Sequence, residues 1–264
     1  KKLIDFKKKI KNSKKIIILK NLNKNKLKFF LSIIATNSNV RFSVFKKLVN
    51  NFNIESFIFE KIVFKKEKEY DLATKIILKK KLKCWINCPR RTWLIFTKLK
   101  KKISKDYKTS IIVRGNNWSI LSNSIHFIDL FAYLTEKYDI SFSLNKLNKQ
   151  LNKTKRIGFY DSFGEILVKN NSNDKLFLIE KKNKSKFFTF KLSNHKTNFF
   201  FDQNNPKNIF KVPYQSDETI KHVRNILKNG DCKLPSYLKT YELHKKYSQN
   251  INSYFKNRKN FLFT

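Results

Sequence analysis

Apolar and polar positions alternate in a regular way over residues 27–88. Three apolar runs of strand length are separated by two stretches in which apolar residues recur every three or four positions, the spacing of one helical face. The strand-type runs are 27–36, 54–61 and 82–88, and the helical stretches are 39–52 and 66–81. The clearest stripe consists of Val40, Val44, Leu48 and Phe52. This order predicts strands of one parallel sheet joined by right-handed helical crossovers.

The pattern changes after Pro89. We expect a helix over 90–103, a strand over 108–118 and a second helix over 122–137. Four strand-like runs follow, divided by turns rich in Asn, Asp, Ser and Lys: 154–170, 174–182, 185–193 and 196–203. Short strands joined by tight polar turns are typical of an antiparallel sheet.

The carboxyl-terminal part returns to helical spacing, with helices expected over 216–230 and 236–255. In the first of them, Ser216 or Asp217 is placed to cap the first turn and Gly230 to end the helix. Its expected buried stripe consists of Ile220, Val223, Ile226 and Leu227. At the opposite end of the chain, the apolar run 15–20 predicts a short strand.

These elements predict an α/β part followed by an α+β part, with a boundary near Pro89. The first part, 1–89, would hold a partial Rossmann-type parallel sheet. The second part, 90–264, would hold a largely antiparallel open sheet with helices on it. The fold class is therefore α/β plus α+β.

The composition is strongly basic but does not indicate a nucleic-acid site. The 264 residues carry 59 Lys and Arg against 19 Asp and Glu, a formal charge of +40, yet seven of the basic residues are Arg. Base readout and bidentate phosphate contacts favour Arg, whereas these lysines are spread among Asn, Ile and Phe, as in a drift toward A/T-rich codons. Hydrophobic residues at 41% predict a folded chain. We expect no specific nucleic-acid partner and a solubility that depends on salt.

Cysteine content and hydropathy indicate a reducing, aqueous compartment. Cys84, Cys88 and Cys232 make an odd number without paired spacing, so we expect free thiols, with Cys84 and Cys88 buried and no metal bound. No run reaches the roughly 18 apolar residues of a membrane span. We expect a cytoplasmic protein without a membrane partner. The chain contains no Met, so we expect it to begin downstream of a natural start.

Ligands of open parallel sheets lie beyond the carboxyl ends of the strands, and three segments of this chain occupy such places. Residues 35–37 offer small side chains and backbone amides at a helix start, although such turns are also ordinary helix caps. Glu60 and Lys61 follow a buried run, where a charged pair is either used by a ligand or lies in a surface turn. The third segment is 87–91.

The run "SNSIHFIDLFAYL", 122–134, places His126 and Asp129 three positions apart in an apolar helix. Taken by itself, a histidine in such a helix is either a satisfied core residue or a proton-transfer group, with Asp129 one turn away to orient its ring. The other histidines, His195, His222 and His244, have no comparable neighbours and are expected to be surface or packing residues.

Four of these segments, taken in order, resemble the Gfo/Idh/MocA family, named for glucose-fructose oxidoreductase and inositol dehydrogenase. They are the Ala-Thr turn of "IIATNS", the Glu-Lys after "FIF", the strand and exit "INCPRRTW", and the segment "GNNWSILSNSIHFIDLFAYL". The closing region "VPYQSDETIKHVRNILKNG" is similar to a bacterial subgroup associated with surface sugar metabolism. The resemblance spans roughly residues 28–264.

The resemblance implies a nicotinamide-dependent oxidoreductase acting on a sugar or nucleotide-linked sugar, with NAD or NADP as cofactor. It implies that 1–89 is part of the nucleotide-binding domain and that 90–264 is the substrate domain, whose sheet forms a homo-oligomer. Lys61 and His126 would be the catalytic pair, His126 transferring the proton. Implied substrate-binding residues are Arg91, Trp93, Ser122, Asn123 and Asp129, and implied cofactor-binding residues are Ala35, Thr36, Asn37, Glu60 and Asn87.

The chain departs from the family pattern at four points. The dinucleotide fingerprint G-x-G-x-x-G is absent, and the whole chain contains four glycines. Ile62 stands where the family has the proline of Glu-Lys-Pro, and Ser122 stands where many members have an aspartate. A serine can bind a substrate but is a poor base at neutral pH. We expect a chain truncated at its amino end or a decaying homologue.

Two other functions compete with the oxidoreductase. One is a non-catalytic degenerate homologue that binds a sugar or serves oligomerisation. The other is a basic nucleic-acid-binding protein, which requires a focused Lys and Arg face and steeply salt-dependent specific binding.

Overall fold

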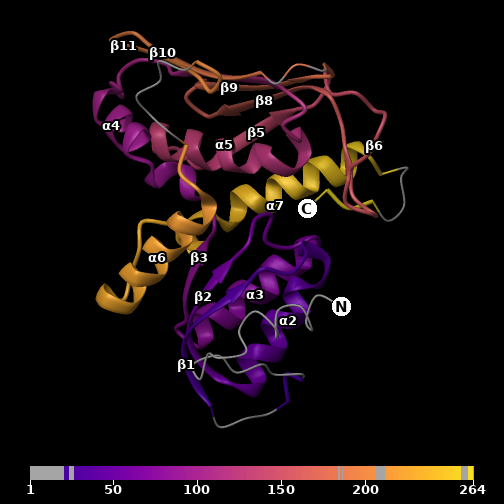
Figure 1. Ribbon diagram of the computed structural model, residues 1–264, viewed down its shortest axis with the longest axis vertical. Coiled ribbons are helices and arrows are strands. Elements are labelled where there is room, and N and C mark those ends of the chain that lie inside the picture. The colour runs from indigo at the N-terminus through magenta and orange to yellow at the C-terminus, as the bar shows by residue number, and fades with distance from the viewer. Residues whose placement is uncertain are drawn as a thin grey trace.

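Two sheets, each with helices packed against it, form two lobes that meet along one long helix (Figure 1). The computed structural model describes residues 21–23, 27–183, 185, 187–205, 212–256 and 261–263. The strand expected at 15–20 lies outside these residues. Among the described residues, no helix has the length and apolar character needed to cross a membrane.

The first lobe is the predicted parallel sheet. Its strands are β1 (Lys28–Ile34), β2 (Asn53–Phe59) and β3 (Lys83–Ile86), which lie in the order β1-β2-β3 and are all parallel. The crossovers are α2 (Ser38–Asn51) and α3 (Glu67–Lys79). Aromatic side chains fill the space between helices and sheet, with Phe45 edge-on to Phe57 and Phe59. The prediction of a partial Rossmann-type sheet is confirmed.

The second lobe is a six-stranded open sheet with the order β11-β10-β4-β9-β8-β5. All neighbouring pairs are antiparallel except β4 and β9, so the predicted largely antiparallel sheet is confirmed. Its strands are β4 (Ser110–Asn116), β5 (Ile140–Ser143), β8 (Gly164–Asn170), β9 (Lys175–Lys181), β10 (Phe188–Asn194) and β11 (Thr197–Asp202). A separate short ribbon joins β6 (Asn152–Lys153) and β7 (Tyr160–Asp161).

One face of this sheet is covered by helices. The buried helix α5 (Ile120–Thr135) lies against it, next to α4 (Leu94–Lys102) (Figure 1). The single helix expected over 90–103 is instead a 3₁₀ turn, η1 (Pro89–Thr92), followed by α4. The two are separated because Trp93 has extended backbone angles and acts as the N-cap of α4.

Helix α6 (Gln215–Asn229) buries a different face from the one expected. Its buried residues are Glu218, His222 and Ile226, whereas Ile220 and Leu227 are 50% and 58% exposed. The reason is polar docking, because Glu218 accepts a hydrogen bond from Thr92 Oγ1 at 3.0 Å. The stripe prediction was therefore wrong except at Ile226 and at the half-buried Val223.

The two ends of α6 also test the sequence interpretation. The N-cap is Tyr214, and neither Ser216 nor Asp217 caps the helix, since both lie inside its first turn. Gly230 ends the helix with φ 67°, in the left-handed region predicted for it.

The closing helix α7 (Tyr237–Tyr254) lies between the lobes and contacts both (Figure 1). Its Tyr237 hydroxyl donates to the Tyr70 carbonyl of α3 at 3.2 Å, and its Tyr247 hydroxyl donates to the Leu121 carbonyl of α5 at 2.9 Å. Because α7 holds α3 and α5 at once, it fixes how the carboxyl ends of β1 and β2 face the start of α5. Pro89 remains our proposed domain boundary.

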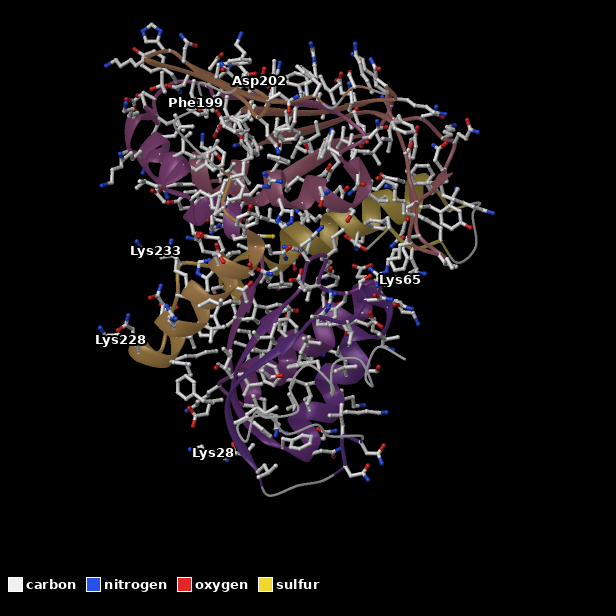
Figure 2. All side chains as sticks on the ribbon, in the orientation of Figure 1. Lys28, Lys65, Phe199, Asp202, Lys228 and Lys233 are labelled. Atoms are coloured by element: carbon white, nitrogen blue, oxygen red, sulfur yellow. The ribbon has the colours of Figure 1, made fainter. Side chains whose placement is uncertain are left out.

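Lysines lie on widely separated parts of the surface. In Figure 2, Lys28 lies at the far end of the first lobe, Lys228 on the projecting end of α6, and Lys65 on the opposite side of the molecule. These labelled lysines do not gather on one face, in keeping with the dispersed charge of the sequence.

Candidate active site

A cavity of about 470 Å³ lies where the two lobes meet. Its walls come from the turn after β1, the turn after β2, the start of α5, and the β6–β7 ribbon with its loop. The lining residues are Ala35, Thr36, Asn37, Arg41, Glu60, Lys61, Ser119, Ser122, Thr154, Arg156, Phe159, Tyr160, Asp161 and Phe263. Because β1 and β2 are parallel, both strands deliver their carboxyl ends to this one edge, as expected for ligand sites of open sheets.

Lys61 links the two lobes. Its Nζ donates hydrogen bonds to the Ser122 carbonyl at 2.8 Å, the Ser122 hydroxyl at 3.2 Å and Asn123 Oδ1 at 2.9 Å. Burial lowers the pKa of Lys61 to about 8, because the charged amine loses its hydration. The structure thus brings Lys61, Ser122 and Asn123 together, with an amine that is partly neutral near physiological pH. The Lys61–Ile62 peptide bond is cis.

His126 lies one helical turn beyond Ser122 on α5 and does not line the cavity. Burial first, and then the charge of Lys61, hold the pKa of His126 well below its usual range, so its imidazole is neutral at physiological pH. Among the described residues, its Nδ1 has no hydrogen-bond partner. The proton-transfer role implied for His126 stays a prediction.

Asp129 does not orient His126, contrary to expectation. Its carboxylate instead accepts hydrogen bonds from Arg91 Nε at 2.7 Å and from Arg91 Nη2 at 2.5 Å. Arg91 is 7% exposed and Asp129 is fully buried. The family resemblance implied that both bind substrate, but neither lines the cavity. Each instead supplies the opposite charge and the hydrogen-bond partner that the other needs when buried. The pairing favours a structural role for both.

Trp93 is also placed outside the cavity. Its ring stacks on Phe96 at 5.9 Å and lines a separate, smaller pocket with Phe127 of α5 and Phe190 of β10. This geometry favours a packing role over the implied contact with substrate.

The turn after β1 offers an unused polar atom. Ala35, Thr36 and Asn37 all line the cavity, and among the described residues the buried Thr36 Oγ1 has no hydrogen-bond partner. Beneath the turn, buried Arg41 donates to the Thr36 carbonyl and, at 2.8 Å each, to the carbonyls of Glu60 and Val63. Arg41 therefore fixes the two strand ends to each other.

Glu60 lines the cavity, whereas Asn87 supports it from behind. Asn87 Nδ2 donates to Glu60 Oε1 at 2.5 Å, and the Asn87 backbone N–H donates to the Phe59 carbonyl at 2.8 Å. The two residues are brought together as an orienting pair at the ends of β2 and β3. Only Glu60 reaches the space where a ligand would lie.

Sequence reasoning missed Asp161 and Glu180, two carboxylates at the start of α5. Asp161 Oδ1 accepts from the Leu121 N–H at 3.0 Å, and Glu180 accepts from the N–H groups of Ser119, at 3.2 Å, and Ile120. Burial first, and then the charge of Asp161, raise the pKa of Glu180 to about 7. Both carboxylates lie in strand-like runs without a recognisable motif, and only the tertiary fold brings them to this helix end.

Arg156 was missed for the same reason. It lies in the loop before β7, where its guanidinium stands over the Phe159 ring at 4.0 Å and donates to Asn37 Oδ1 in the other lobe. This contact bridges the two sides of the cavity.

A polar cluster lies behind the cavity. Cys88 Sγ lies 4.0 Å from His244 Nε2, and both side chains are buried. Burial raises the pKa of the Cys88 thiol and lowers that of His244 to about 3, so both are neutral. The prediction that Cys84 and Cys88 are buried free thiols is confirmed. Within the described ranges, no group of three or more His, Cys, Asp or Glu side chains is arranged to hold a metal ion.

Comparison with known proteins finds similarity of fold only. No protein-family model matches the sequence, and no curated protein matches it either. Solved structures do match. A protein assigned as a myo-inositol dehydrogenase from Sinorhizobium meliloti 1021 superposes with a TM-score of 0.64 at 13% identity, covering 86% of this chain and 79% of that one.

Two further structures give the same result. A probable dehydrogenase from Thermotoga maritima matches with a TM-score of 0.63 at 11% identity, covering 85% of this chain and 77% of that one. Scyllo-inositol dehydrogenase from Lactobacillus casei, solved with NAD(H) and scyllo-inositol, matches with a TM-score of 0.58 at 15% identity, covering 84% and 77%. The chain therefore has the fold of these dehydrogenases.

Proposed function

We propose that the chain is an NAD(P)-dependent oxidoreductase of the Gfo/Idh/MocA family, which interconverts a hydroxyl and a carbonyl group on a sugar or nucleotide-linked sugar. The observation that carries this proposal is the position of Lys61. Lys61 follows the carboxyl end of β2 and lines the cavity between the lobes, and its amine donates hydrogen bonds to Ser122 and Asn123 of α5. The proposal is supported by a fold shared with inositol dehydrogenases.

The residues of the cavity suit the reacting end of such a ligand pair. Lys61 would donate a hydrogen bond to the reacting oxygen, and Ser122 would hold a neighbouring hydroxyl group. Thr36 Oγ1, which has no hydrogen-bond partner in the described part of the chain, and the amide of Asn37 would hold the cofactor's nicotinamide end at the turn after β1. When bound, the nicotinamide supplies hydride chemistry.

The residues present do not fit the cofactor's other end. The sequence holds no G-x-G-x-x-G, whose glycines let a backbone approach the pyrophosphate. Tight binding by these residues alone is therefore not part of the proposal. We also propose that the protein is cytoplasmic and that it assembles through the six-stranded sheet.

The missing fingerprint favours a second candidate, a non-catalytic homologue that binds a sugar in the same cavity. The two candidates differ in what Lys61 does. A catalyst needs the amine for turnover, whereas a binding protein needs at most its hydrogen bonds.

The test is a fluorescence titration of NADH and NADPH, followed by turnover assays with inositols and nucleotide-linked sugars. It should be run on this chain and on a form with any upstream coding sequence restored. The variants are Lys61→Met and, as a control on the exposed face of α3, Lys75→Met. The oxidoreductase is supported if the protein binds a nicotinamide cofactor and turns over a substrate, and if Lys61→Met abolishes this while Lys75→Met does not. Saturable binding of a sugar without nicotinamide binding in either form supports the second candidate.

A further inference from the structure

Asp161 lines the cavity and is held mainly by backbone N–H groups. The cavity contains two carboxylates, Glu60 and Asp161. Glu60 accepts a hydrogen bond from Asn87 at 2.5 Å.

The carboxylate of Asp161 is held in place by the start of α5. Its Oδ1 accepts from the backbone N–H groups of Leu121 at 3.0 Å and of Ser162 at 2.9 Å, and the Ser119 hydroxyl also hydrogen-bonds it. A group fixed in this way loses little freedom when a ligand binds, which is the arrangement that efficient proton transfer requires.

The surroundings of Asp161 suit a proton acceptor. Burial, the largest influence, raises the pKa of its carboxyl group and makes the carboxylate more basic, while the hydrogen bonds from Leu121, Ser162 and Ser119, and then the charge of Lys61, lower that pKa. The charged groups that act on it are Lys61 at the end of β2 and Glu180 on β9, and Arg156 of the preceding loop lines the same cavity. Asp161 therefore belongs electrostatically to the same site as Lys61.

The other polar groups of the site suit proton transfer less well. Ser122 has a hydroxyl group that is a poor base at neutral pH. Lys61 donates from its Nζ and therefore serves as a hydrogen-bond donor rather than a proton acceptor, and His126 does not line the cavity.

We propose that Asp161 is a catalytic residue that accepts the proton of the reacting hydroxyl group, while Lys61 donates a hydrogen bond to the oxygen. This role rests on the function proposed above. During oxidation the substrate O–H bond breaks, its electron pair forms the C=O bond, and the proton forms a new O–H bond on Asp161. With the cofactor bound, the oxidised nicotinamide would take up the C–H electron pair as hydride, which balances the step. In the reductive direction Asp161 returns the proton.

The test compares Asp161→Asn with wild type. Asparagine keeps the shape and the Oδ1 acceptor for the Leu121 N–H, so the start of α5 is preserved while the charge is lost. Glu165→Gln on β8, outside the cavity, is the matched control. His126→Asn tests the alternative that His126 accepts the proton.

The first readout does not depend on turnover. The pKa of Lys61 is measured from the pH dependence of its acetylation, followed by peptide mass spectrometry. Since a nearby carboxylate stabilises the charged amine, Asp161→Asn should lower that pKa and raise the labelling rate about threefold at a fixed pH. An unchanged pKa of Lys61 in Asp161→Asn would overturn the proposal.

The second readout is the pH profile of kcat/KM. In Asp161→Asn we expect kcat/KM to fall by a factor of about 10² to 10⁴. We also expect the decrease of kcat/KM at low pH, the acidic limb of the profile, to disappear. Glu165→Gln should leave both unchanged. If the activity of Asp161→Asn stays within threefold of wild type, the role of Asp161 is overturned. If only His126→Asn loses the acidic limb, that role belongs to His126. A wild-type protein without nicotinamide-dependent turnover overturns the proposed function itself, and with it this role.

Discussion

At the residue scale, part of the site was predicted from the rule that ligands bind beyond the carboxyl ends of parallel strands. Residues 35–37, Glu60 and Lys61 follow strands, and all of them line the cavity. The rule cannot find Asp161 or Arg156, because they come from a ribbon that only tertiary contacts bring to the same place. It also cannot separate Arg91 from the site, since Arg91 follows β3 but turns inward to Asp129.

The Arg91–Asp129 pair leads to a prediction about stability. Removing either partner leaves a buried charge without compensation, so Arg91→Met and Asp129→Leu should each lower the free energy of unfolding by about 3–5 kcal/mol. The double variant should lose much less than the sum of the two. Urea unfolding followed by circular dichroism measures all three, and losses that simply add would show that the two side chains act independently.

The raised pKa of Glu180 leads to a prediction of how the free energy of unfolding depends on pH. Its pKa is raised from 4.5 to about 7 in the folded protein, so folding favours its protonated form. Its contribution to stability is therefore complete below pH 4.5 and is lost as pH rises toward 7. Between pH 5 and 8 at fixed ionic strength, the free energy of unfolding should fall less in Glu180→Gln than in wild type. Equal slopes in the two proteins would refute the assignment, and Glu165→Gln is the control.

At the scale of elements, spacing predicted the helices and strands of the parallel sheet because each buries one regular apolar face. The apolar stripe of α6 misled because Glu218 and His222 dock that helix through polar contacts with Thr92. Helix α5 shows a related limit. Its N-cap, Ser119, makes no side-chain cap bond, and the caps come from Asp161 and Glu180 on distant strands.

The start of β8 depends on a glycine. Gly164 has φ +118°, and a Cβ at this position would lie 2.3 Å from the Lys146 carbonyl oxygen. Gly164→Ala should lower the free energy of unfolding by about 2–4 kcal/mol, because the backbone must move. Gly158 has φ +82° with no heavy atom within 4 Å of the added Cβ, so Gly158→Ala should cost about 1 kcal/mol. Equal losses in thermal or urea unfolding would contradict this account.

At the scale of the whole molecule, the six-stranded sheet leaves one face without helices (Figure 1). Strand register places Phe200, Lys191, Ile112, Phe177 and Leu167 in one row across it. Figure 2 shows Phe199 and Asp202 at the outer edge, on β11. A row with four apolar side chains and one lysine on an open sheet supports the proposed homo-oligomer.

This row gives a test of assembly. Phe200 is 64% exposed, and Phe200→Lys should convert the oligomer to a monomer in size-exclusion chromatography with light scattering. Leu94→Lys on α4, at a position 65% exposed, is the matched control and should leave the mass unchanged. A wild-type monomer, or an oligomer that Phe200→Lys leaves intact, would rule out this face as the interface.

We propose that hydride leaves a carbinol carbon in the cavity between the lobes, with Lys61 at the reacting oxygen. The most direct measurement is deuterium transfer from ring-deuterated scyllo-inositol and related polyols to NAD⁺ or NADP⁺, followed by mass spectrometry of the nicotinamide. We predict transfer by the wild-type protein, a decrease of about 10²-fold or more in Lys61→Met, and full transfer in Lys75→Met. No transfer from any polyol, or equal transfer in Lys61→Met and wild type, would show that Lys61 does not serve hydride transfer in this cavity.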